Sequence, residues 1–203
     1  IVTTPVIDVL YQKFDGKVQL DFLLEKNHKQ LLDENPYLTN LYLLDNVRKE
    51  NQFQIIKEIR KQKYDYVFDF FGNPRSAWIT FFSGAKYKYG YDYKGRSFLY
   101  NKVVKRDKNP KYVVDFKMDL LKDLGIKPGY RKTSFYFDDK LTSEMKNFLL
   151  ESGWDGKQKI LGLVTPNVRK IAMIKNWVFE RYIELANRVQ KELGAFVVIL
   201  WGP

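Results

Sequence analysis

Hydrophobic and polar positions follow two alternating periods along this chain. Short apolar runs with strand-like spacing are followed by longer stretches in which apolar residues recur at three- and four-residue steps. This order is typical of βα units in a mainly parallel sheet. The expected strands are Val18 to Leu24, Leu41 to Leu44, Tyr64 to Phe70, Tyr87 to Tyr91, Ser134 to Phe137, Lys159 to Val164 and Phe196 to Trp201. The expected helices are Pro5 to Phe14, Gln52 to Gln62, Pro74 to Phe82, Val113 to Leu124, Ser143 to Ser152 and Val178 to Leu193.

The chain divides at a polar, glycine-containing segment, Glu151 to Lys157. Residues 1–152 predict a Rossmann-like domain with a parallel sheet, and its first strand is missing because no strand precedes the first expected helix. Residues 157–203 supply a single β-α-β unit, which buries too little apolar surface to be stable alone. We therefore expect an α/β protein with the start of a second Rossmann-like domain, truncated in this sequence at both ends.

Composition narrows the possible chemistry. The chain has 203 residues, 45% hydrophobic and 16% aromatic, which is enough for a substantial core. Cysteine is absent and His28 is the single histidine, so disulfides, thiolate metal sites, cysteine nucleophiles and catalytic pairs with a second histidine lose support. No apolar run approaches the roughly 18 residues of a membrane-spanning helix. We expect a cytoplasmic protein that uses neither a metal nor a cofactor.

The charge balance indicates a polyanionic partner. Thirty-five lysines and arginines stand against 24 acidic residues, which gives a net charge of +11 and a pI near 9.5. Such a chain is attracted to nucleic acid, phosphorylated lipid or a nucleotide-linked substrate. Charge does not choose among these three classes.

The junction between an apolar strand and a Gly72-Asn73-Pro74 turn is the most informative part of the chain. Open α/β sheets bind ligands where parallel strands end and helices begin. Asn73 is suited to cap the following helix and Pro74 to stand in its first turn. Arg75 adds a cation beside backbone N–H groups that already favour an anion. A phosphate or carboxylate is therefore the expected ligand at this turn.

A second candidate is Lys175-Asn176-Trp177, which opens the last long helix after the loop Thr165 to Ile174. A lysine at the mouth of a βα loop, near a helix N-terminus, can neutralise a diphosphate as it leaves a sugar. The alternative is a solvated lysine beside a packing tryptophan. Spacing alone favours this alternative, because surface lysines are common.

A third candidate is the run from Lys86 to Arg96, which interleaves cations with aromatic residues. Single-stranded nucleic-acid binders use such runs, and sugars also stack on such rings. The alternative is a strand with alternating faces followed by a glycine-containing turn. In either case Lys94 and Arg96 are expected to contact phosphate.

Several motifs of other enzyme classes are absent from the sequence. There is no Asp-x-Asp pair for a divalent metal, no G-x-G-x-x-G and no G-x-x-x-x-G-K-[ST], so dinucleotide oxidoreductases and P-loop enzymes are disfavoured. Among the carboxylates, Asp69 is better placed for a ligand than Asp65, because it lies nearer the carboxyl end of its strand. His28 is expected on a surface helix, without a ligand role.

Taken in order, several segments resemble the heptosyltransferase family of bacterial lipopolysaccharide assembly, glycosyltransferase family 9. Each segment is a weak signal by itself, and together they cover nearly the whole chain. The similar segments are Val2-Thr3-Thr4-Pro5-Val6 at the first βα turn, Asn35-Pro36-Tyr37, the "D-x-x-G-N-x-R-S" element from Asp69 to Ser76, Ser83-Gly84-Ala85-Lys86 with Tyr89-Gly90-Tyr91, the "K-x-W" of Lys175 to Trp177, and Gly202-Pro203.

This resemblance implies a GT-B glycosyltransferase with two Rossmann-like domains, metal-independent and inverting. The acceptor would bind the N-terminal domain, and ADP-heptose mainly the C-terminal one. Lys175 would stabilise the departing diphosphate, with Thr165 and Asn167 also on the donor side. The family's catalytic base is an Asp directly before the segment that matches Ile1, so we expect residues 1–203 alone to be inactive. The acceptor side would comprise Thr3, Thr4, Gly72, Asn73, Arg75, Lys94 and Arg96.

The resemblance also offers a partner for the basic charge. The precursor of lipopolysaccharide, with its core and lipid A, is phosphorylated and lies in an anionic membrane leaflet. Peripheral contact with the cytoplasmic face of the inner membrane is therefore expected. The alternative function is a non-catalytic basic α/β module that binds nucleic acid through residues 87–96, and nucleic acid is the less favoured partner.

Overall fold

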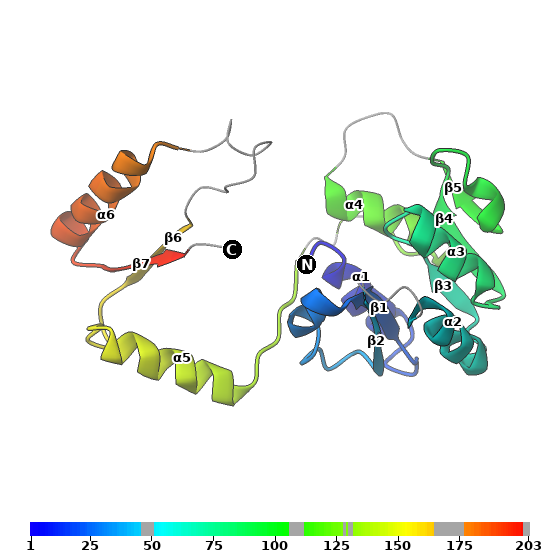
Figure 1. Ribbon diagram of the computed structural model, residues 1–203, viewed down its shortest axis with the longest axis horizontal. Helices are drawn as coiled ribbons and strands as arrows, with labels where there is room; N and C mark the ends of the chain where they lie inside the picture. Colours follow the sequence, from blue (N-terminus) through cyan, green and yellow to red (C-terminus); the bar gives the residue numbers. More distant parts are fainter. Residues whose placement is uncertain (46–50, 106–111, 128, 130–131, 165–176, 201–203) are drawn as a thin grey trace. The chain divides into compact units, whose positions relative to one another are not determined.

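The computed structural model describes residues 1–45, 51–105, 112–127, 129, 132–164 and 177–200, and it divides into two compact units (Figure 1). The units are Ile1–Phe137 and Asp138–Pro203. The boundary expected between Glu151 and Lys157 lies later in the chain than this division. The intervening helix therefore groups with the second unit.

The first unit alternates helices and strands as the apolar periods predict. Its elements are α1 (Thr4–Lys13), β1 (Asp21–Glu25), η1 (Lys26–Leu31), β2 (Asn40–Leu44), α2 (Asn51–Gln62), β3 (Tyr66–Phe68), α3 (Pro74–Phe82), β4 (Tyr87–Tyr91), η2 (Ser97–Leu99), β5 (Lys102–Val104), α4 (Val113–Met118) and η3 (Asp119–Leu124). The η elements are 3-10 helices, and His28 lies in η1.

The strands of the first unit pair in parallel, as predicted. One sheet contains β1 and β2, and the other has the order β3-β4-β5. A cavity of about 690 Å³ lies between β1 and β3, lined also by Val6, Ile7 and Leu10 of α1. Among the described residues, no strand pairs with the β1 and β3 edges beside this cavity.

The faces of the β3-β4-β5 sheet carry different side chains because successive strand residues point to opposite sides. Tyr89 and Tyr91 pack with Leu120 of η3 and Phe116 of α4. The opposite face lies against α3 and η2, where Ala77, Leu99 and Tyr100 form a second buried cluster.

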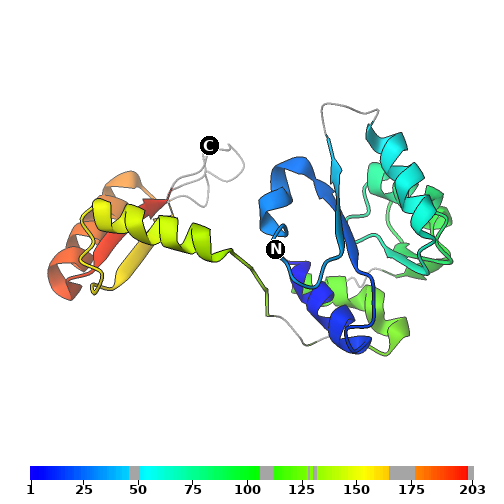
Figure 2. The same ribbon diagram turned by 90° about the horizontal axis from the view of Figure 1, so that it is seen from below.

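The second unit contains one β-α-β crossover preceded by a helix (Figure 2). Its elements are α5 (Asp139–Glu151), β6 (Ile160–Val164), α6 (Phe179–Leu193) and β7 (Phe196–Leu200). β6 and β7 are parallel along their whole length. The N-terminus of α5 is capped by Asp138, whose Oδ1 accepts from Leu141 N at 2.6 Å, so this helix begins before the predicted Ser143.

One predicted strand is wrong, and one observed strand was not predicted. Residues 134–137 form no strand, because Ser134 N donates to Thr4 Oγ1 at 3.0 Å and the Ser134 hydroxyl donates to Asp8. The segment is therefore bonded to α1 through side chains instead of joining a sheet. Strand β5 was not predicted, since three residues are too few to show a period.

Candidate functional site

The predicted turn after β3 is built around the carboxylate of Asp69, which is only 4% exposed. Asp69 Oδ1 accepts from Phe71 N at 3.0 Å and from Gly72 N at 2.8 Å. Oδ2 accepts from the hydroxyls of Ser76 at 2.9 Å and Tyr100 at 2.7 Å. Both oxygens are thus engaged by the protein itself. These bonds make Asp69 the residue that holds the turn, and its contact with a ligand stays a prediction.

The turn passes into α3 through local geometry that the sequence predicts correctly. Gly72 has φ +68°, a left-handed conformation that favours glycine. Asn73 caps α3, because its Oδ1 accepts from Ser76 N at 2.7 Å, and Pro74 is the first helical residue. The helix N-terminus is therefore fixed at the carboxyl end of β3, where backbone N–H groups favour anions.

Gly90 of β4 makes room for the side chain that completes this turn. A Cβ at Gly90 would lie 2.3 Å from Cζ of Tyr100, far inside van der Waals contact. The ring of Tyr100 can lie flat against β4 only because residue 90 is glycine. Burial, together with the hydrogen bond to Asp69, raises the pKa of Tyr100 well above its usual value. Tyr100 is therefore a neutral hydrogen-bond donor at neutral pH.

Arg75 projects from the first turn of α3 towards the segment before α2. Its Nη2 donates to the carbonyl oxygen of Asp45 at 2.9 Å, and its Nε donates to Gln52 Oε1 at 3.3 Å. The side chain is half-buried. Arg75 thus links three elements at the carboxyl edge of the sheets, and its contact with an acceptor stays a prediction.

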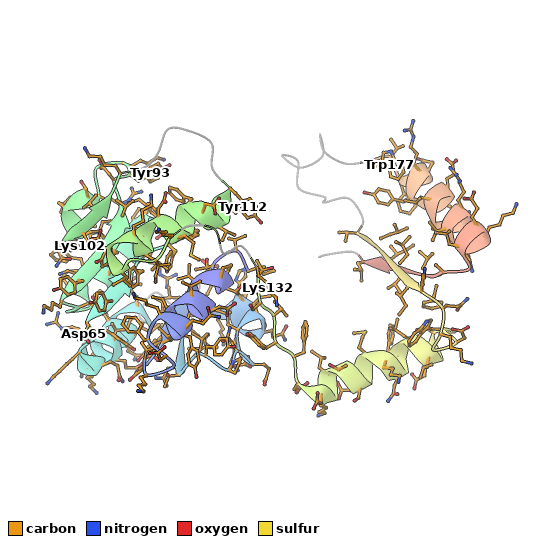
Figure 3. The ribbon with its side chains drawn as sticks, turned by 180° about the vertical axis from the view of Figure 1, so that it is seen from behind. Asp65, Tyr93, Lys102, Tyr112, Lys132 and Trp177 are labelled. Atoms are coloured by element: carbon orange, nitrogen blue, oxygen red, sulfur yellow. The ribbon has the colours of Figure 1, made fainter. Side chains whose placement is uncertain are left out.

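The loop after β4 brings two more cations towards the same turn. Arg96 Nη2 donates to the carbonyl oxygen of Gly72 at 2.8 Å, while its buried Nε has no hydrogen-bond partner among the described residues. Arg96 Cζ lies 5.3 Å, and Lys94 Nζ 5.2 Å, from the ring centroid of Tyr93. Tyr93 is labelled in Figure 3, and Lys94 is exposed. The structure therefore joins Arg96 to the predicted turn and leaves Lys94 accessible beside it.

Lys117 of α4 is a cation at this edge that the sequence analysis missed. Its Nζ donates to the carbonyl oxygen of Phe70, the residue after Asp69. Burial lowers the pKa of Lys117, and the nearby Asp69 carboxylate opposes that shift. A lysine inside the apolar helical stretch Val113 to Leu124 was the available signal.

The predicted acceptor residues at the start of the chain lie at the N-terminus of α1. Thr4 is buried, and its hydroxyl oxygen accepts from Ser134 N at 3.0 Å. Thr3 is half-buried at the N-cap position and makes no side-chain capping bond. Their contacts with an acceptor stay predictions. The predicted donor residues Thr165, Asn167 and Lys175 lie outside the described residues.

The alternation of side chains along β4 decides between the two interpretations of the run from Lys86 to Arg96. Tyr89 and Tyr91 of β4 are 3% and 5% exposed, and the Tyr91 ring stacks on Phe116 with centroids 4.2 Å apart. The predicted strand followed by a turn is confirmed by β4 and by positive φ at Lys94 and Gly95. The two buried rings offer no face on which a nucleic-acid base could stack.

Neither a metal-binding cluster nor a membrane-spanning helix occurs among the described residues. No group of three or more histidine, cysteine, aspartate or glutamate side chains is arranged there to hold a metal ion. Among these same residues, no helix combines the length and apolar character that crossing a membrane requires.

The fold and the turn define an α/β protein with parallel sheets and a cationic edge where strands end and helices begin. Residues 52–203 match the profile of glycosyltransferase family 9 (heptosyltransferase), and the chain belongs to this family. The resemblance seen in the sequence is thereby confirmed.

Relatives and solved structures agree with this assignment. The chain is 25% identical to lipopolysaccharide heptosyltransferase 3 of Escherichia coli K12 in an alignment of length 217, which covers all of this chain and 60% of that protein. A family 9 glycosyl transferase from Veillonella parvula has a TM-score of 0.85 at 18% identity, covering 100% of this chain and 58% of that one. E. coli heptosyltransferase WaaC, solved with ADP, has a TM-score of 0.71 at 17% identity, covering 100% and 63%. The chain thus spans about 60% of its relatives, and the predicted GT-B type α/β fold is confirmed.

Proposed function

We propose that the protein containing this chain transfers a heptose from ADP-heptose to the phosphorylated core of a lipopolysaccharide precursor. Family membership supports a glycosyltransferase, and the curated relative is a lipopolysaccharide heptosyltransferase. Solved relatives were crystallised with ADP and with ADP-2-deoxy-2-fluoro heptose. We further propose an inverting reaction that requires no metal, as the family resemblance implies.

The observation that carries the proposal is the set of cations around the Asp69 turn. Arg96 and Lys117 donate to the carbonyl oxygens of Gly72 and Phe70 after β3, and Arg75 donates to that of Asp45 after β2. Lys94 is exposed in the loop that carries Arg96. Together with the N-terminus of α3, they create a positive field suited to the phosphates of an acceptor. The acceptor therefore binds the first unit, with Gly72 and Asn73 shaping the turn.

Catalysis in this proposal needs one group that acts on the acceptor hydroxyl and another that acts on the departing diphosphate. A carboxylate before Ile1 removes the hydroxyl proton, and Lys175 stabilises the departing diphosphate, with Thr165 and Asn167 binding the donor in the second unit. Measurable transfer by this chain alone would contradict the assignment of the base.

The same proposal places the protein in the cytoplasm, with peripheral contact to the inner membrane. The acceptor is a lipid in an anionic leaflet, and the net charge of +11 favours approach to such a surface. A nucleic-acid module is the weaker alternative, because Tyr89 and Tyr91 are buried. Salt-sensitive oligonucleotide binding that is lost on Tyr93→Ala would restore that alternative.

Lys94→Ala tests the acceptor site without removing a buried contact. We expect KM for a phosphorylated acceptor to rise about threefold to tenfold, with kcat nearly unchanged and with little change for a dephosphorylated acceptor. Lys140→Ala on α5, whose side chain is 81% exposed, is the matched control and leaves both constants unchanged. Equal effects of Lys94→Ala on both acceptors would show that this lysine does not recognise phosphate.

A further inference from the structure

Helix α3 carries apolar residues on both of its sides. Its inner side buries Ala77 and Ile79 against the core of the first unit. Its outer side exposes Trp78, Phe81 and Phe82, which are spaced by three and four residues and so form one stripe. A helix that is apolar all round is normally covered on all sides. We therefore expect a binding partner to cover the outer stripe.

The exposed rings form one continuous surface, which we call the aromatic patch: Trp78, Phe81 and Phe82 of α3 with Phe98 of η2. Their exposed fractions are 42%, 38%, 44% and 68%. The Trp78 ring centroid lies 5.8, 5.6 and 6.4 Å from those of Phe81, Phe82 and Phe98, respectively. Contiguous exposed apolar surface of this kind marks an interaction site.

Two cations border the aromatic patch. Lys88 Nζ lies 5.4 Å from the ring centroid of Phe81. Arg60 of α2 reaches the end of α3, where its Nη1 donates to the carbonyl oxygen of Phe82 at 3.1 Å. Tryptophan and phenylalanine favour the interface between lipid headgroups and acyl chains, and nearby cations are attracted by anionic lipid. The combination of aromatic residues and cations fits a membrane surface.

We propose that the aromatic patch docks this protein on an anionic lipid bilayer. The proposal rests on the proposed function and deepens it by identifying the surface that contacts the membrane. Asn73 caps the same helix whose outer stripe forms the patch. Insertion of Trp78 and its neighbours would therefore hold the Asp69 turn close to the headgroups, where a lipid-linked acceptor presents its sugars. A second protein copy on the patch is the competing outcome.

The test uses the full-length protein and vesicles without lipopolysaccharide or nucleotide sugar. We expect binding to vesicles of phosphatidylglycerol and phosphatidylethanolamine, and much weaker binding to phosphatidylcholine alone. The double variant Phe81→Ser/Phe98→Ser should weaken binding to the anionic vesicles about tenfold. Phe137→Ser changes another exposed phenylalanine, 59% exposed in the segment bonded to α1, and should leave binding unchanged.

A second measurement does not depend on a disruptive substitution. Lipids brominated on their acyl chains should quench part of the tryptophan fluorescence of the wild type. Trp78→Phe keeps an aromatic ring, so it should retain vesicle binding while losing that quenched part. Retained quenching in Trp78→Phe, or unchanged binding of the double variant, would overturn the proposal. A concentration-dependent dimer that is abolished by Phe81→Ser/Phe98→Ser, without vesicle binding, would overturn it in favour of self-association.

The outcomes separate this proposal from the proposed function. Transfer to a soluble, lipid-free acceptor reports on the chemistry alone. If the double variant loses vesicle binding and keeps that transfer, the membrane proposal is supported independently of catalysis. If the wild type shows no transfer and still binds anionic vesicles through the aromatic patch, the proposed function fails while the membrane surface stands.

Discussion

Replacing Asp69 tests whether this carboxylate organises the turn after β3. Its oxygens accept four hydrogen bonds, two from backbone N–H groups and two from hydroxyls, in a site where the side chain is 4% exposed. A hydrogen bond to a charged group contributes roughly 1.5–3 kcal/mol, and bonds in one network are not additive. Asp69→Ala leaves the two backbone N–H groups and the Tyr100 hydroxyl without an acceptor, and the Ser76 hydroxyl with only its 3.2 Å bond to the Asn73 carbonyl oxygen. We therefore expect a loss of about 4 kcal/mol in unfolding free energy.

Asp69→Asn should cost less, about 2 kcal/mol, because its oxygen can still serve the N–H groups of Phe71 and Gly72. The new amide then faces the hydroxyls of Ser76 and Tyr100, which can rotate to accept from it. The cost comes from the lost negative charge and from poorer geometry in the two hydrogen bonds with the hydroxyls. The two substitutions thus form a graded series at one site.

The assay is urea unfolding of the full-length protein, monitored by circular dichroism. The urea midpoints of the variants are converted to differences in unfolding free energy with one common m-value. Asp65→Asn is the control, because Asp65 is exposed near the other end of β3, and its effect should stay within about 0.5 kcal/mol. A change below about 1 kcal/mol for Asp69→Ala would refute the organising role. Normal stability of Asp69→Asn combined with abolished transfer would instead mean that Asp69 acts directly on substrate.

Three further predictions concern Gly90 and Tyr100 beside the Asp69 turn, and the separate contact between Thr4 and Ser134. Gly90→Ala should destabilise the protein by about 2–4 kcal/mol, because the new Cβ displaces the Tyr100 ring. Thermal unfolding measures this loss, and an unchanged melting temperature would contradict the close packing of Tyr100 on Gly90. The pKa of Tyr100 is raised in the folded state, so the stability that this residue contributes is present below pH 10 and is lost as the pH rises beyond that. In urea unfolding at a series of pH values, Tyr100→Phe should therefore flatten the fall in unfolding free energy above pH 10. Parallel plots of unfolding free energy against pH for the two proteins would count against a neutral, hydrogen-bonded Tyr100. Thr4→Val should cost about 1 kcal/mol by leaving Ser134 N without its acceptor, seen as faster exchange of that amide hydrogen, whereas unchanged exchange would argue against the contact.

Local features of this chain could be predicted from sequence, because they depend on neighbouring residues. The Asn73 cap spans three positions, and the parallel β4 strand follows from alternation within its own residues. The family could be recognised because short motifs recur in a fixed order. The helix predicted over Val113 to Leu124 was right in place, although it changes from α4 to the 3-10 helix η3 at Met118.

Features that join distant parts of the chain could not be predicted. The Tyr100 hydroxyl meets Asp69 across 31 positions, and Lys117 reaches Phe70 across 47. No local pattern records such contacts. The same long range explains why Ser134 binds to α1, 130 positions from Thr4, instead of forming a strand.

The measurement that tests the central claim most directly is sugar transfer by the full-length protein. It is incubated with ADP-heptose and a heptose-free lipopolysaccharide acceptor, and the products are weighed by mass spectrometry. The account predicts one added heptose in the wild type and loss of that product on Lys175→Ala. Absence of transfer with ADP-heptose and with other nucleotide sugars, from protein shown to be folded, would contradict it.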